Sequence, residues 1–219
     1  MKTNAIYITD SEWFENSSLK NPICPLDHNL EQRYPTFYNA NYDLKILATK
    51  APTEEEKNSP IYNDYRERYG ASDIAVMDSA VASCSAKNIF LNGFEQEQFD
   101  YISPLIKETA EILYLFKCTG ISNLGALSEF KKLKGVFIFA NHGLKSLWDM
   151  RSNRDLQVIS FTHITKLQNI EALTESCVEY VSFDSSDHYG NKKEMLFDQA
   201  IFQKMPKLKH LFLTYQNIL

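Results

Sequence analysis

The chain has 219 residues, a formal net charge of −5 from 28 acidic and 23 basic side chains, and 44% hydrophobic residues. This length suffices for one large domain with a substantial core. Because the chain is acidic and has no extended basic cluster, it lacks the positive field that attracts nucleic acid or anionic membranes. We therefore expect neither nucleic acid nor a membrane as a partner.

The amino-terminal sequence MKTNAIYITDSEWFENSS contains no apolar run like that of a secretory signal, and no apolar stretch long enough to span a membrane follows. We expect a cytoplasmic protein, although a processed export leader outside this sequence would overturn that expectation. The four cysteines lie far apart in the chain, which favours free thiols over a disulfide framework. They are Cys24, Cys84, Cys118 and Cys177.

Residues 1–85 have no regular repeat. Short strands are predicted near AIYIT and YDLKILAT, a polar loop over KAPTEEEKNSP, and a helix within residues 61–86. We interpret 1–85 as an irregular amino-terminal capping region.

From residue 86 onward the chain repeats a spacing in which two apolar residues stand two positions apart. These ladder pairs are Ile89 and Leu91, Leu113 and Leu115, Val136 and Ile138, Ile159 and Phe161, Val181 and Phe183, and Leu211 and Leu213. The pairs follow one another at steps of 24, 23, 23, 22 and 30 residues, and the longer last step contains the polar insertion SSDHYGNKKEM. Such a period indicates one strand per repeat.

Between the strands, apolar residues recur at every third position, as in Ile121, Leu124, Leu127 and Phe130. This period is typical of a 3₁₀ turn or a short helix that returns the chain to the next strand.

The strand pattern resembles the leucine-rich repeat, L-x-x-L-x-L-x-x-[N/C], in its short forms. The clearest units are Ala110, Leu113, Leu115, Cys118 and Ile121, and Leu133, Val136, Ile138, Asn141 and Leu144. The resemblance covers residues 86–219 and implies an α/β solenoid, a right-handed superhelix with a parallel concave sheet of about six strands. That family functions mainly by binding.

Two departures from the family pattern have consequences. The first concerns the repeat position at which the family favours Asn or Cys, and only two of the six residues at that position are Asn or Cys. We therefore expect an interrupted hydrogen-bond ladder. The six residues are Phe94, Cys118, Asn141, Ile164, Ser186 and Gln216. The last repeat is incomplete, because LTYQNIL ends after a strand. This predicts an uncovered edge near Leu211, Leu213 and Leu219, available for self-association or another chain, unless the sequence is part of a longer one.

The residues between the ladder positions point away from the core of such a solenoid, onto its concave face. Many of them are apolar or aromatic, so something must cover this face. The predicted partner-binding residues are Phe90, Tyr114, Phe116, Phe137, Phe139, Tyr180 and Phe212. A one-residue slip of register in the second and third repeats would leave the face apolar.

Three covers for this face stay open. The first is the chain's own amino-terminal segment, including the predicted helix over 62–84. The second is a partner helix or extended peptide that docks on the aromatic rings. The third is a second copy of the chain.

Few residues of the sequence suggest catalysis or metal binding. Cys24 and His28 offer two metal ligands, but no second close pair follows, so no metal site is predicted. Four residues near the strand ends form a predicted His/Asp rim: His142, His163, Asp184 and His188. They could act in general acid–base catalysis if their side chains came within hydrogen-bond distance. No matching nucleophile and no glycine-rich phosphate loop accompany them. Cys118 occupies a ladder position and is expected to be structural.

We therefore expect a protein that is not an enzyme, needs no cofactor, and recognises a protein or peptide through the aromatic concave face. A bacterial immunity or effector-type binding protein is a narrower alternative. An enzyme or metal protein that uses the His/Asp rim is the alternative from another class.

Overall fold

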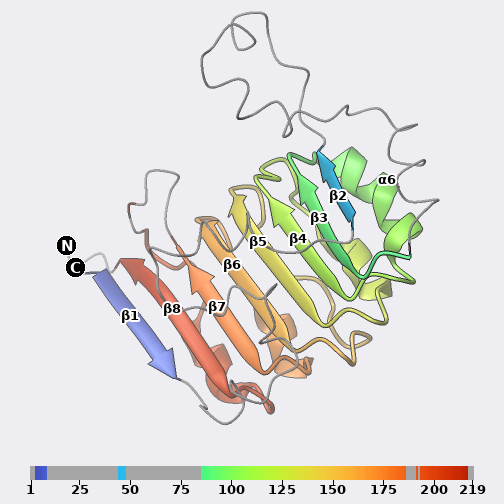
Figure 1. The fold of residues 1–219 in the computed structure, drawn as a ribbon. Coiled ribbons are helices and arrows are strands. Elements are labelled where there is room, and N and C mark those ends of the chain that lie inside the picture. Colours follow the sequence, from blue (N-terminus) through green and yellow to red (C-terminus); the bar gives the residue numbers. More distant parts are fainter. Residues whose placement is uncertain (1–2, 9–43, 48–84, 186–190, 192, 217–219) are drawn as a thin grey trace, which may run out of the picture.

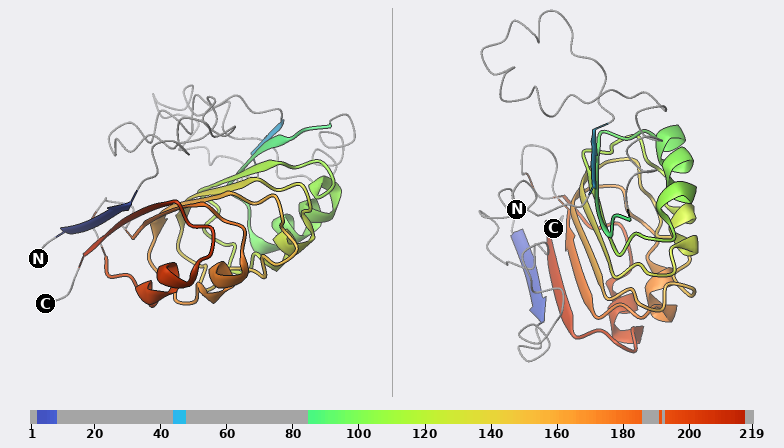
Figure 2. Two further views of the ribbon diagram at one scale, coloured as in Figure 1. Left: turned by 90° about the horizontal axis from the view of Figure 1, so that it is seen from below. Right: turned by 45° about the vertical axis from the view of Figure 1, so that its right-hand side comes forward.

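The computed structural model of the protein describes residues 3–8, 44–47, 85–185, 191 and 193–216. One eight-stranded sheet dominates it, and the helical segments lie on one face of that sheet (Figures 1 and 2). In chain order the elements are β1 (Thr3–Ile8), β2 (Leu44–Leu47), β3 (Asn88–Asn92), α6 (Gln96–Ile106), β4 (Ile112–Phe116), η2 (Gly125–Glu129), β5 (Gly135–Asn141), β6 (Val158–Ile164), η3 (Glu171–Glu175), β7 (Tyr180–Asp184), η4 (Gln199–Lys204) and β8 (His210–Gln216).

Strands β3 to β8 lie side by side as parallel neighbours in chain order, as the ladder spacing predicts. The ladder positions are in register throughout: Leu113 is opposite Ile89 and Val136, and the same alignment continues to Leu211. All twelve ladder residues belong to the main hydrophobic core. The open parallel sheet with few helices fits an α/β fold.

The one-residue slip of register does not occur. Leu113 and Leu115 lie in the main core, whereas Tyr114 and Phe116 belong to a separate apolar cluster. Because successive side chains of a strand point to opposite faces, this second cluster lies on the other face of the sheet. We call that other face the strand face.

Both strands predicted in the amino-terminal region are confirmed, and they join the same sheet at its two opposite ends. β2 pairs in parallel with β3, and β1 pairs antiparallel with β8 (Figure 1). The prediction of an uncovered edge after β8 is therefore wrong. A strand about 200 residues away in sequence satisfies the backbone groups of that edge, and no local pattern reveals such a pairing. The predicted polar loop, the helix within 61–86 and Leu219 lie outside the described residues.

The segments that return the chain between strands are short, as predicted. η2, η3 and η4 are 3₁₀ helices, whereas the segment after β5 returns through turns. The segment after β3 forms the longer helix α6, which was not predicted from the sequence. Its buried residues Phe99, Ile102, Ser103 and Ile106 recur at helical spacing, and Gln98 accepts a hydrogen bond from the backbone N–H of Glu95 at the helix start.

A residue with left-handed backbone conformation lies near the end of each of the four consecutive strands β3 to β6. These residues occupy equivalent repeat positions and are Gly93, Lys117, Ala140 and His163, with φ of 72°, 52°, 57° and 56°. Such a conformation is strained for residues other than glycine. It bends the chain so that the next residue of each repeat enters the core, and those next residues are Phe94, Cys118, Asn141 and Ile164.

Asn141 makes the side-chain hydrogen bonds of the ladder position. Its Nδ2 donates to the carbonyl oxygens of Cys118 at 2.9 Å and Ile121 at 2.8 Å. Its Oδ1 accepts from the backbone N–H groups of Gly143 at 2.9 Å and Leu144 at 2.8 Å. One buried amide thus satisfies four backbone groups of two neighbouring repeats.

A second buried asparagine, Asn153, joins the return segments of two repeats. Its Nδ2 donates to the carbonyl oxygens of Leu127 and Phe130, each at 2.8 Å, and its Oδ1 accepts from Trp148 Nε1 at 2.8 Å. Asn153 was not among the residues predicted from the sequence. One feature of the sequence could have indicated it. Asn153 stands 23 positions after Phe130, the equivalent residue of the preceding repeat, and thus puts a polar side chain where that repeat has a buried aromatic ring.

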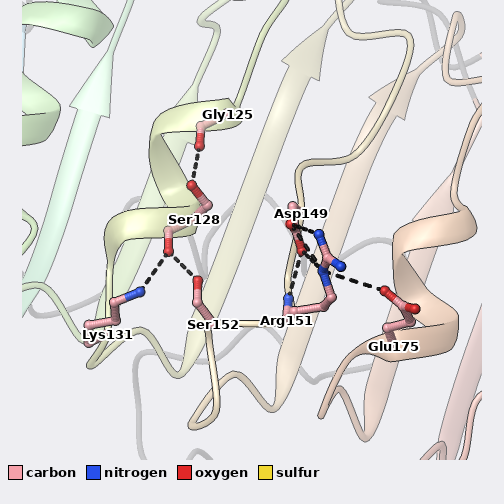
Figure 3. A network of polar contacts seen from close by, with 7 residues as sticks. All are labelled: Gly125, Ser128, Lys131, Asp149, Arg151, Ser152 and Glu175. Atoms are coloured by element: carbon pink, nitrogen blue, oxygen red, sulfur yellow. Dashed lines mark hydrogen bonds and ion pairs between the residues drawn. The ribbon is translucent and has the colours of Figure 1, made fainter.

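Further polar contacts also connect neighbouring return segments (Figure 3). Ser152 Oγ donates to the carbonyl oxygen of Ser128 in the repeat before it. Arg151 is paired with Asp149 in its own turn and lies 3.6 Å from Glu175 of the next repeat. The hydrogen bond from Arg151 lowers the pKa of Asp149 to about 2. The contacts of Arg151 contribute little to stability, because they are open to solvent.

Charged residues stand two positions before five of the six ladder pairs, and Gln157 stands before the fourth. Glu111 is 2.8 Å from Lys87 and 2.6 Å from Lys134, its equivalents in the adjacent repeats, and Lys209 is 3.4 Å from Glu179. Lys134, and after it Lys87, holds the pKa of Glu111 below its ordinary value. These ion pairs between neighbouring strands favour the same strand register as the ladder residues do.

Replacing Glu111 with glutamine is expected to lower the free energy of unfolding by about 0.5–1 kcal/mol at pH 7. The folded-state pKa of Glu111 is depressed, so its contribution is present above the unfolded-state pKa and is lost as the pH falls through the folded-state value. The difference between wild type and Glu111→Gln should therefore vanish in acid. Urea titrations between pH 7 and pH 2 measure it, and a difference independent of pH would contradict this assignment.

Candidate functional site

The strand face holds the seven residues predicted to bind a partner, and the structure buries all of them. Their exposed fractions lie between 0% and 6%, and they are Phe90, Tyr114, Phe116, Phe137, Phe139, Tyr180 and Phe212. The inference that something must cover a face so rich in apolar groups is confirmed. As the protein stands in this structure, these rings are not an open docking surface.

Six of the seven residues form one apolar cluster. It joins Phe90, Tyr114, Phe116, Phe137, Phe139 and Tyr180 to three residues that were not among the predicted ones, Ile112, Ala140 and Val158. Phe212 is buried but does not belong to this cluster. The sequence places Ile112 and Val158 on the same face, because each stands at the start of a strand, one residue before the first ladder position.

The rings are stacked from strand to strand. Ring centroids are 5.7 Å apart for Phe90 and Phe116, 4.9 Å for Phe116 and Phe139, and 4.8 Å for Tyr114 and Phe137. These are the separations at which aromatic pairs attract each other beyond their burial. The parallel register brings the same ring position of each repeat next to its equivalent.

Gly135 at the start of β5 leaves room for this stack. A Cβ atom at that position would lie 3.0 Å from Cε2 of the Phe137 ring. Glycine therefore permits the ring to lie close over its own strand.

The composition of the strand face changes along the sheet. β3 to β5 carry five of the seven rings, whereas β6 and β7 carry Tyr180 together with the buried polar residues Ser160, Thr162, Ser182 and Asp184. Thr162 and Asp184 are opposite each other in the β6–β7 register. Buried hydroxyl and carboxylate groups favour hydrogen-bonded packing over a uniform apolar docking surface. Their burial was not predicted.

The predicted His/Asp rim is divided between surface and interior. His142 is partly exposed, whereas His163 and Asp184 are buried. The rings of His163 and Phe139 are nearly perpendicular, with their centroids 4.8 Å apart, so His163 packs against the aromatic cluster. His188 lies outside the described residues.

Cys118 has the structural role expected from its ladder position. It is fully buried, and its Sγ lies 3.5 Å from the carbonyl oxygens of Leu91 and Phe116. Burial raises the pKa of its thiol to about 12. Cys118 and the partly exposed Cys177 are free thiols, as predicted; Cys24 and Cys84 lie outside the described residues.

Iodoacetamide at pH 8 is expected to leave Cys118 unmodified in the folded protein, because the reagent attacks the thiolate and burial disfavours that form. Cys177, which is partly exposed, should be labelled. Peptide mass spectrometry before and after unfolding in urea distinguishes the two sites. Equal labelling of both thiols in the folded protein would contradict the structural role of Cys118.

Within the described ranges, no group of three or more His, Cys, Asp or Glu residues is placed to hold a metal ion. Cys24 and His28, the pair weighed as ligands, lie outside those ranges. In the described part of the chain, none of the helices has the length and apolar character needed to cross a membrane.

Comparison of the chain with known proteins adds no assignment: no family model matches it, and neither does any curated protein.

Proposed function

We propose that residues 86–219 form a degenerate leucine-rich-repeat solenoid, a right-handed superhelix with 1–85 as its capping region, and that the protein functions in non-catalytic recognition of a protein or peptide. The single observation that carries this proposal is the common register of the six ladder pairs on consecutive parallel strands. Stacked repeats of this kind supply an extended, rigid surface and place no reactive group by themselves.

Three further features support the repeat assignment. Left-handed residues recur at equivalent strand ends, short 3₁₀ segments return the chain, and Asn141 binds the backbone of two repeats. The ladder is interrupted as expected, since Phe94 and Ile164 fill equivalent positions with apolar groups.

The burial of the seven rings limits how recognition works. A partner reaches Phe116 or Phe137 only if the groups that bury them are displaced. We therefore propose that the rings act first as a second core that keeps the sheet rigid, and that they contact a partner only in an uncovered form.

Affinity capture from a native lysate, with the full chain as bait, tests recognition. We expect a retained protein whose binding site maps, by hydrogen exchange, to described residues of this chain. Phe116→Asp and Phe137→Asp then separate the two roles of the rings: unfolding marks them as core, whereas a folded variant that loses the retained protein marks them as a docking site.

If the protein were instead an enzyme, variants of the His/Asp rim would give a different result. If the His/Asp rim were catalytic, alanine at His142, His163 or Asp184 would abolish a measurable turnover and leave partner capture unchanged. A bait that retains no protein, together with such a turnover, would refute the recognition proposal. An immunity or effector-type role is the narrower form of the same proposal, and the identity of the captured partner decides it.

A further inference from the structure

The two strands at the ends of the sheet differ in length and charge. β2 has four residues, LKIL, and contains Lys45. β1 has six residues, TNAIYI, and contains no charged residue, no proline and no glycine. Short length and charged side chains are features by which proteins keep an edge strand from pairing with another chain. β2 has both features, whereas β1 has neither.

β1 uses one of its two edges inside the chain. Its residues pair antiparallel with β8, from Thr3 opposite Gln216 to Ile8 opposite Leu211. β1 is the last strand in the order of the sheet, and no strand of the described residues lies beyond it (Figure 1). An edge strand directs the N–H and C=O groups of every second residue away from its single neighbour. The outer edge of β1 therefore offers a row of backbone groups to an incoming strand.

A second copy of β1 can pair with this edge in only some registers. In an antiparallel pair, two residues that face each other direct their backbone groups either both toward the neighbouring strand or both away from it. When two identical edges pair, residues separated by an even number of positions must therefore face each other. One residue then faces its own copy on the twofold axis. Ala5 and Ile6 are the two central residues that keep nearly the whole of β1 paired.

The charges that flank β1 favour the register centred on Ile6. Lys2 stands four positions before Ile6, and Asp10 stands four positions after it. In this register Lys2 of each copy faces Asp10 of the other, and opposite charges on facing residues stabilise a strand pair. A register centred on Ala5 pairs neither charge with its opposite. Lys2 and Asp10 lie outside the described residues, and their complementarity follows from the symmetry of the sequence.

From these observations we propose that the protein forms a twofold-symmetric dimer in which the outer edges of two β1 strands pair antiparallel, centred on Ile6. Thr3 of each copy then faces Thr9 of the other, which is also a favourable cross-strand pair. The two sheets become one continuous sheet, with both strand faces on the same side. The self-association predicted for the last edge of the sheet thus moves from β8 to β1. This inference goes beyond the proposed recognition function and does not rest on it.

Sedimentation equilibrium of the full chain over a series of concentrations tests the proposal by measuring the dissociation constant of the dimer. Lys2→Glu and Asp10→Lys each replace the two attractive pairs with two repulsive ones. Each variant should raise the dissociation constant by about tenfold, equivalent to about 1.4 kcal/mol. The double variant Lys2→Glu/Asp10→Lys restores opposite charges and should return the dissociation constant to within about threefold of wild type.

A matched control and a pair of cysteine variants locate the interface. Lys132→Glu makes the same charge change at an exposed residue after η2 and should leave the dissociation constant within about twofold of wild type. Ile6→Cys places two thiols on the twofold axis, where facing Cα atoms lie about 4.5–5.5 Å apart, a separation that a disulfide can bridge. Ala5→Cys places them on diagonal positions, beyond that reach. Peptide mass spectrometry after mild oxidation should therefore detect an intermolecular disulfide at position 6 and not at position 5.

Four results, each in variants with wild-type circular dichroism, would overturn the proposal. They are a wild-type chain that stays monomeric at every concentration, a dimer that responds to neither charge change, a loss that the double variant does not restore, and a disulfide that forms as readily at position 5 as at position 6. A monomeric wild type would leave the edge of β1 to a strand of another protein. None of these results bears on capture of a partner, so the recognition proposal stands or fails separately.

Discussion

The Phe137→Asp substitution is expected to unfold the protein at 25 °C. Phe137 is fully buried and stacked on Tyr114, so the change removes the packing of a core ring, at a cost of about 3–5 kcal/mol. It also buries a carboxylate without a designed partner, which costs several kcal/mol more. Together these losses are comparable with the whole free energy of unfolding of a typical domain, about 5–15 kcal/mol. Far-UV circular dichroism and urea titration measure the outcome.

Two control variants make this result interpretable. Phe137→Leu keeps the site apolar and should cost less than the aspartate change, about 1–3 kcal/mol. Leu105→Asp introduces the same carboxylate at a residue of α6 whose exposed fraction is 43%, and should change stability by no more than about 0.5–1 kcal/mol. A Phe137→Asp protein that stays as stable as Leu105→Asp would show that the strand face is open in solution.

Replacing Asn141 with alanine is expected to lower the free energy of unfolding by about 3–5 kcal/mol. The variant leaves the carbonyl oxygens of Cys118 and Ile121 and the N–H groups of Gly143 and Leu144 without their buried partner. Because these groups belong to two repeats, the loss should also reduce cooperativity between them, which would appear as a smaller urea m-value.

Asn123→Ala is the matched control for Asn141→Ala. Asn123 also accepts a hydrogen bond from a backbone N–H two residues later, that of Gly125, but this bond is exposed and water can replace it. We expect a change below about 1 kcal/mol. Similar losses for both asparagines would mean that the ladder amide is no more important than an ordinary turn.

Parts of the candidate site were readable from the sequence, and others were not. The ring positions followed from strand periodicity, because residues between two core positions must point to the other face. Which predicted residues meet in one cluster depended on contacts across strands: Tyr180 joins the aromatic cluster, whereas Phe212 does not.

The sequence by itself determined the strand positions and their parallel order, because an apolar spacing repeated at nearly constant steps places equivalent positions side by side. The face that each ladder residue takes in the second and third repeats was decided by the structure, since residues on both faces there are apolar and buried. Only the tertiary structure decided that the strand face is closed, that β1 pairs with β8, and that Asn153 links two return segments. These features depend on contacts between residues far apart in the chain, and local periodicity contains no information about such partners.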